Sequence, residues 1–198
     1  MASSSMYSTF NRIIEMEREL LKAAISKFKG EERRSESGEY DLNKDLIIPL
    51  NEKCESIFRE MSENRDEDNW EICKKLIDLK FRLESLYYMT NSKVKVPEPI
   101  MDSIEDLFGS TLLSMKKLSE VFEQPTTPHE VLVNNVKEIE RLERLADQTH
   151  IVIYKQISSL LSSRDGVDRF SLLVLRDIAE NMEVILDIIE DISKIFSS

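Results

Sequence analysis

Residues 168–196 read DRFSLLVLRDIAENMEVILDIIEDISKIF. Their apolar side chains recur every three or four positions, and the recurring residues are Leu175, Ile178, Met182, Ile185, Ile189, Ile192 and Phe196. Because an α-helix turns once in about 3.6 residues, this spacing places one apolar stripe along one helix face. The stretch therefore predicts a long helix that buries this stripe inside a helical bundle.

The rest of the chain has the same period and predicts five further helices, at about residues 7–29, 41–61, 69–90, 99–123 and 127–162. Pro49 is expected either to kink the second of these helices or to mark its first true turn. The Pro97–Pro99 segment separates the third helix from the fourth. Thr127 and Glu130 predict a capping box, with Pro128 at the first helical position. No segment alternates with a period of two over a useful length, so no β-sheet is expected.

Three helices, a break that contains two prolines and three more helices predict an all-α fold. We expect six long helices in two three-helix bundles related by a pseudo-twofold repeat. The first bundle would comprise residues 1–96 and the second residues 97–198. The four glycines and five prolines among 198 residues are few, which favours long uninterrupted helices.

An internal repeat is indicated by two alignments of the halves. Leu142 lies 92 positions after Leu50, and at this offset the apolar positions of the two segments coincide. A second alignment, at an offset of 99 positions, pairs Asp78 with Asp177 and Glu84 with Glu183. The difference between the offsets fits a longer second hairpin, although ordinary helical periodicity would also produce part of this match.

The composition restricts the class of partner. Residues of hydrophobic type make up 41% of the chain and charged residues 33%, as in globular proteins, and the formal net charge is −11. Such a charge repels phosphate backbones, so no nucleic-acid partner is expected. Cys54 and Cys73 lack the spacing of a metal motif and fit a reducing cytoplasm. The N-terminal residues do not resemble a secretory signal, and no apolar run of about 18 residues predicts a membrane span.

Two ridges of acids are the strongest candidate for chemistry. Glu143 and Asp147 are four residues apart, as are Glu183 and Asp187, so each pair lies one turn apart on one helix face. Like charges at this spacing repel, and water, a base or a cation must offset them. The helical angles place Glu183 and Asp187 away from their apolar stripe, whereas Glu143 and Asp147 flank theirs. Both ridges are therefore expected at the surface, where acids are often merely solvated.

Three neighbouring residues extend the candidate site. Glu190 and Asp191 continue the second ridge, and His150 follows Asp147 by three residues. Carboxylates alone favour hard or borderline cations, and a histidine ligand would favour iron or zinc over magnesium or calcium. The predicted metal ligands are Glu143, Asp147, His150, Glu183, Asp187, Glu190 and Asp191.

The first bundle contains only part of this pattern. By the repeat alignment, the four ridge acids correspond to Asn51, Glu55, Glu84 and Tyr88, of which two are carboxylates. The second bundle is therefore the better candidate for a cation site, and the first is expected to be mostly scaffold.

Residues 138–147, EIERLERLAD, and 175–191, LRDIAENMEVILDIIED, resemble the PhoU-like proteins. The resemblance is closest to the branch of unknown function that accompanies Pit-type inorganic phosphate permeases. It implies two three-helix bundles with Glu/Asp-x-x-x-Asp motifs that bind iron, zinc or similar cations on the bundle surface. The residues that match the motif are Glu143, Asp147, Glu183 and Asp187, whereas Asn51 and Tyr88 depart from it.

The resemblance implies a cytoplasmic, non-enzymatic accessory or regulatory protein of phosphate transport. Its partner would be a phosphate permease or the regulatory component of one at the membrane surface, and it would form a homo-oligomer. A second hypothesis is a metal-free helical module that oligomerises through exposed apolar residues such as Tyr87 and Tyr88. A third is a carboxylate metalloenzyme, for which His129 and His150 offer little support, because neither has a glutamate three positions before it.

Overall fold

The computed structural model describes residues 4–30, 41–63, 66–90, 94–123, 128–163 and 168–195. These ranges contain α1 (Ser4–Phe28), the π-helical turn η1 (Asn43–Ile47), α2 (Ile48–Glu63), α3 (Glu67–Thr90), α4 (Glu98–Phe122), α5 (His129–Ser162) and α6 (Arg169–Ile195). They contain no β-strand. The all-α prediction, with six long helices, is confirmed.

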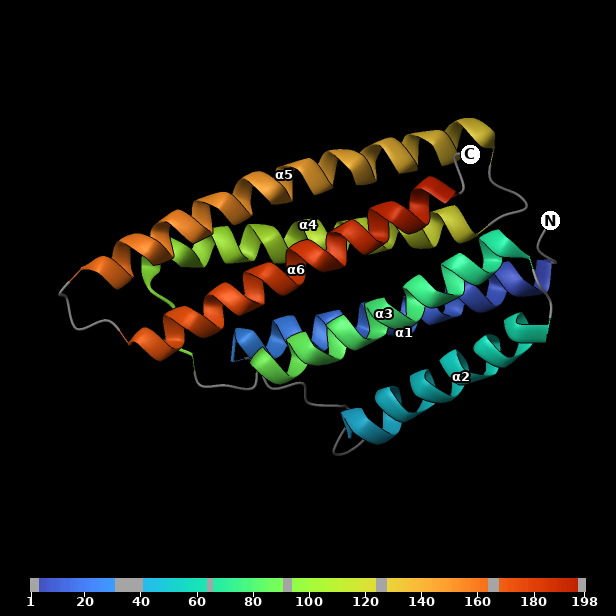
Figure 1. The fold of residues 1–198 in the computed structure, drawn as a ribbon, viewed down its shortest axis with the longest axis horizontal. Coiled ribbons are helices and arrows are strands. Elements are labelled where there is room, and N and C mark those ends of the chain that lie inside the picture. The colour runs from blue at the N-terminus through green and yellow to red at the C-terminus, as the bar shows by residue number, and fades with distance from the viewer. Residues whose placement is uncertain are drawn as a thin grey trace.

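The helices run side by side along the long axis of the molecule (Figure 1). Helices α1, α3, α4 and α6 occupy the centre, α2 packs on α1 and α3, and α5 packs on α4 and α6 (Figure 1). The first half, α1 to α3, and the second half, α4 to α6, are therefore each a group of three mutually contacting helices. The halves meet where α1 packs on α4 and α3 packs on α6.

The apolar stripe of α6 lies in the core, as its spacing predicts. Its members from Leu175 to Ile192 are fully buried, and Phe196 lies outside the described residues. One continuous core includes side chains from all six helices. Because burying a large aliphatic or aromatic side chain contributes about 1.5–3 kcal/mol, this shared core holds the two halves together.

The buried positions of the two halves correspond. Residues of α1 and α4 that lie 94 positions apart in the sequence are both buried, as in the pairs Phe10 and Ile104, Ile14 and Phe108, and Ala24 and Leu118. Residues of α3 and α6 that lie 99 positions apart behave alike, as in the pairs Leu76 and Leu175, Leu79 and Ile178, and Leu83 and Met182. This correspondence agrees with the repeat, which remains a prediction.

Most helix boundaries lie within three residues of the expected ones, but the segment expected as one helix at about 41–61 is divided into η1 and α2. Pro49 is the second residue of α2, directly after η1, so it lies in the first turn of α2. Pro128 directly precedes α5 with an extended backbone instead of occupying the first helical position. Thr127 of the predicted capping box lies outside the described residues, as do the predicted loop residues 31–40 and turn residues 164–167.

The described helices contain no segment that is both long and apolar enough to cross a membrane.

Candidate metal site

The two acidic ridges lie on helices that pack against each other. Glu143 and Asp147 belong to α5, and Glu183 and Asp187 belong to α6. Asp187 is exposed, whereas the other three are half-buried, so the ridges lie at the edge of the α5–α6 contact and not fully on the outer surface. The helical angles thus placed the acids outside the core, but they did not reveal how far the neighbouring helix covers them.

The carboxyl groups of the two ridges interact across the helix pair. Partial burial raises the pKa of Glu143, and repulsion from Asp147, Glu190 and Asp187 raises it further, together with a hydrogen bond between the Glu143 and Asp147 side chains. The contribution of Asp187 shows that the ridges of α5 and α6 share one electrostatic environment. In that environment a proton or another cation on Glu143 is favoured.

The acids of α6 respond in the same way. Partial burial raises the pKa of Glu183, and the Asp187 and Asp147 carboxylates raise it further. Partial burial also raises the pKa of Asp187, followed by repulsion from Asp147, Asp191 and Glu190, while Lys194 opposes the shift. In the described ranges, none of the four ridge acids forms an ion pair with a lysine or arginine. Their negative charge is therefore largely uncompensated.

His150 lies beside the same acids. The electrostatic effect of its imidazole lowers the pKa of Glu183, which places the ring near the α6 ridge. The ring of Tyr154 packs edge-on against the imidazole, with 5.7 Å between the ring centres. The Nε2 atom is buried and has no hydrogen-bond partner among the described residues. Burying a nitrogen without a hydrogen-bond partner costs free energy, so this nitrogen is suited to bind a metal ion.

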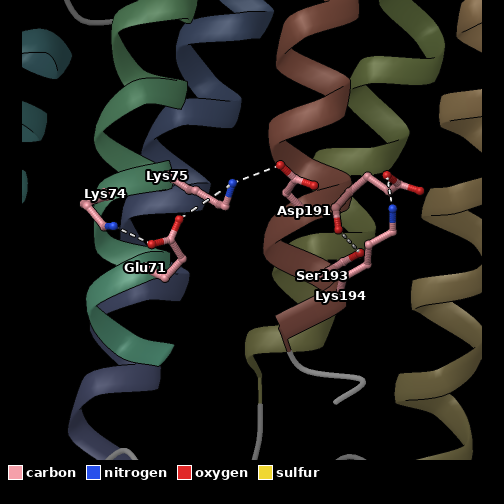
Figure 2. A network of polar contacts seen from close by, with 7 residues as sticks. Glu71, Lys74, Lys75, Asp191, Ser193 and Lys194 are labelled. Carbon is pink, nitrogen blue, oxygen red and sulfur yellow. Dashed lines mark hydrogen bonds and ion pairs between the residues drawn. The ribbon is translucent and has the colours of Figure 1, made fainter. Parts of the chain in front are cut away.

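Glu190 and Asp191 differ from the four ridge acids because each is paired with a lysine. Lys194 binds Glu190 one turn away on α6, and Lys75 reaches from α3 to Asp191 with a nitrogen–oxygen distance of 2.9 Å (Figure 2). Lys75 also faces Glu71, four residues before it on α3 (Figure 2). The structure therefore assigns these two predicted ligands to existing ion pairs, and Asp191 helps to join the two halves.

The donor types suit a cation, but the side chains do not surround one as they stand. Within the described ranges, no three His, Cys, Asp or Glu side chains are arranged to hold a metal ion. The ridge acids of α5 and α6 would have to turn about their side-chain bonds to converge. Such rotations are accessible to half-exposed carboxylates, and the chemistry of oxygen donors with one imidazole nitrogen fits a divalent cation.

The corresponding place in the first half contains a lysine that sequence reasoning missed. Lys80 of α3 has a side chain only 7% exposed, donates a hydrogen bond to the side chain of Asn51 on α2, and lies 3.7 Å from the carboxylate of Glu84. Its counterpart 99 positions later in the second half is the buried Ala179. A lysine at a buried position of an apolar stripe is the sequence signal that could have found it.

Glu17 of α1 is the other charged residue that the sequence reasoning overlooked. It is fully buried, and neither carboxyl oxygen has a hydrogen-bond partner among the described residues. Burial raises its pKa well above the usual range, and the nearby Lys80 only partly opposes the shift. The carboxyl group is therefore favoured in its protonated form.

The two tyrosines expected on an oligomer surface differ. Tyr88 is 56% exposed, as predicted. Tyr87 is only half-exposed, because Lys27 of α1 lies over its ring and donates a 3.1 Å hydrogen bond to its hydroxyl group. The prediction of an exposed Tyr87 was wrong.

Comparison of the chain with models of known protein families and with curated proteins found no match.

Proposed function

We propose that the chain is a non-enzymatic accessory protein that binds a divalent cation through Glu143, Asp147, Glu183 and Asp187. The observation that carries this proposal is the electrostatic state of the α5–α6 acids. Three of the four have pKa values raised by burial and mutual repulsion, and no lysine or arginine within the described ranges forms an ion pair with them. A bound cation would remove this repulsion.

The donor set limits which cations are suited to the site. Carboxylate oxygens alone would favour magnesium, calcium or manganese. If the Nε2 atom of His150 joins them, the set would favour iron or zinc. The Nε2 atom of His150 is buried without a hydrogen-bond partner, which supports the second donor set, so iron or zinc is the cation we favour.

The wider role rests on the resemblance of residues 138–147 and 175–191 to PhoU-like proteins. We propose that the metal-loaded face engages a basic surface on an inorganic phosphate permease, or on its regulatory component, at the cytoplasmic side of the membrane. The net charge of −11 supports a basic partner surface, because it favours association with positive charge.

Elemental analysis of purified protein tests the cation site. The wild type, prepared with added iron and zinc, is compared with a Glu143→Ala/Asp187→Ala variant. A Glu55→Ala/Asp78→Ala variant is the matched control, because it removes two acids from α2 and α3. We expect metal in the wild type and in the control but not in the ridge variant. A metal-free wild type would contradict the proposal, and equal metal in all three would place the site elsewhere.

A metal-free interaction module is the second candidate, and exposed aromatic side chains favour it. Phe58 of α2 and Phe81 of α3 are 42% and 56% exposed, and Tyr88 lies on the same helix as Phe81. Exposed aromatic residues on one face are typical of protein interfaces. Light scattering after size-exclusion chromatography, on the wild type and a Phe58→Ser/Phe81→Ser variant, tests it. If this function is correct, the wild type is an oligomer and the variant is a monomer.

A further inference from the structure

We propose that the first half contains a cation site whose occupant is the ammonium group of Lys80, and that this site accepts a small primary ammonium ion once the lysine side chain is removed. The inference does not depend on the proposed function, because it concerns α1, α2 and α3 alone.

The surroundings of the Lys80 ammonium group are those of a bound cation. The side-chain oxygen of Asn51 accepts a hydrogen bond from it, and a carboxylate oxygen of Glu84 lies 3.7 Å away. The face of the Phe81 ring lies 3.9 Å from the nitrogen, which is within the range of a cation–π interaction. An amide oxygen, a carboxylate and an aromatic face are three partners that an ammonium ion uses.

Buried carboxyl oxygens that accept no hydrogen bond lie near the lysine. Both oxygens of Glu17 and one oxygen of Glu84 are buried without a hydrogen-bond partner among the described residues. The thiol of Cys54 also faces this cluster, and its pKa is raised to about 12 by burial first and by Glu17 second. Lys80 is the buried positive charge of this cluster, and Glu84 is the acid that pairs with it. Without it, the cluster would retain acceptors and no cation.

An open pocket leads to this cluster from the surface. It has a volume of about 430 Å³ and lies between α2 and α3, and its walls include Asn51, Phe58, Ile77, Lys80 and Phe81. A small ion can therefore reach the place of the lysine nitrogen without unfolding either helix. Its aromatic and aliphatic walls would accept the carbon chain of an alkylammonium ion, while the buried oxygens would bind its nitrogen.

The second half supports the interpretation by contrast. Its counterpart of Lys80 is Ala179, and its acids Glu143 and Glu183 have raised pKa values and form no ion pair with a described lysine or arginine. The same position thus holds a tethered cation in one half and none in the other. The difference is a single side chain that carries one positive charge.

Chemical rescue tests the proposal. In a Lys80→Ala variant, the lost atoms correspond to three carbons and one nitrogen, so n-propylammonium chloride is the matched probe and sodium chloride is its salt control. We expect the variant to lose more than roughly 100-fold in its folding equilibrium constant. Propylammonium at about ten times its dissociation constant should restore about tenfold of that loss. Propylammonium chloride should not change the folding equilibrium constant of the wild type or of a Lys74→Ala variant, in which the replaced lysine is an exposed residue of the same helix.

A response of the same size in all three proteins would overturn the proposal, as would a Lys80→Ala variant that is stable and insensitive to the ion. If Lys80→Ala does not fold by itself, the helical circular dichroism signal is followed during the propylammonium titration. A gain of helix supports the site, and no gain contradicts it. A Lys80→Met variant, which fills the space without charge, should show no response to the ion.

Discussion

The two halves of this molecule differ in how the charge of the acids on α3 and α6 is compensated. On α3, Lys80 lies against Asn51 and Glu84, so a positive charge from the chain itself offsets the Glu84 carboxylate. On α6, Ala179 provides no ammonium group for Glu183, and burial together with repulsion from Asp187 raises the pKa of this acid. Acid spacing alone therefore does not define a cation site, because a lysine from the chain can offset the charge of an acid.

The largest expected effect concerns the lysine itself. Lys80→Met should lower the free energy of unfolding by about 3–5 kcal/mol, because removing one member of a buried ion pair leaves its partners uncompensated. Urea denaturation measures this difference. Lys74→Met is the matched control, since Lys74 pairs with Glu71 at the surface of the same helix. Equal losses of unfolding free energy in the two variants would show that Lys80 stabilises the first half no more than an exposed lysine does.

The second prediction concerns the acids of the other half. Mn²⁺, which prefers oxygen ligands, should raise the free energy of unfolding of the wild type by about 2.7 kcal/mol at 100 times its dissociation constant. A Glu183→Gln/Asp187→Asn variant should not respond, because it lacks the charges of the α6 ridge. Thermal unfolding with and without the ion measures the effect. A gain of the same size in the variant would contradict the assignment to α6.

The third prediction uses the buried carboxyl group of the first half. Because the folded state raises the pKa of Glu17, folded protein retains a proton that unfolded protein loses. This contribution to stability is fully present below the ordinary glutamate pKa and is lost as pH rises toward the raised value. Above about pH 4.3, stability should fall by up to about 1.4 kcal/mol per pH unit more steeply in the wild type than in Glu17→Gln. Identical pH profiles of urea denaturation would contradict the buried, protonated state.

The smallest effect concerns the contact between the halves. Lys75→Ala removes the 2.9 Å ion pair with Asp191 across α3 and α6 (Figure 2). The loss should be about 0.2–1 kcal/mol, because Asp191 is half exposed and solvent screens the pair. A double-mutant cycle with Asp191→Ala isolates this interaction energy. A coupling energy of zero would show that the shared apolar core alone joins the halves.

The helical period predicted most of the fold. The stripe from Leu175 to Ile192 is buried throughout, because periodicity reports which face a helix must cover, whatever its partners are. Pro49 was ambiguous in sequence, since a proline suits both a kink and a first turn, and the start of α2 at Ile48 decides for the first turn.

The polar contacts were less predictable. Local spacing identified Glu143 and Asp147, whereas the pairing of Lys75 with Asp191 joins residues 116 positions apart and depends on how α3 and α6 pack. Tyr87 was expected on the surface, but Lys27 from α1 covers it. Lys80 interrupts an apolar stripe in the sequence, yet its role depends on Asn51 of another helix. Tertiary packing decides such contacts, and no periodic pattern encodes them.

Transferring the lysine to the second half tests most directly whether an ammonium group of the chain can take the place of a bound cation. Calorimetric titration with Mn²⁺ compares the wild type with Ala179→Lys, and Ala179→Met serves as the control for the added volume at this buried position. Circular dichroism first establishes that each variant is folded. We expect the wild type and Ala179→Met to bind the ion and Ala179→Lys not to bind it, because the ammonium group of the new lysine would neutralise Glu183. A folded Ala179→Lys protein that binds Mn²⁺ as tightly as the wild type would contradict this expectation.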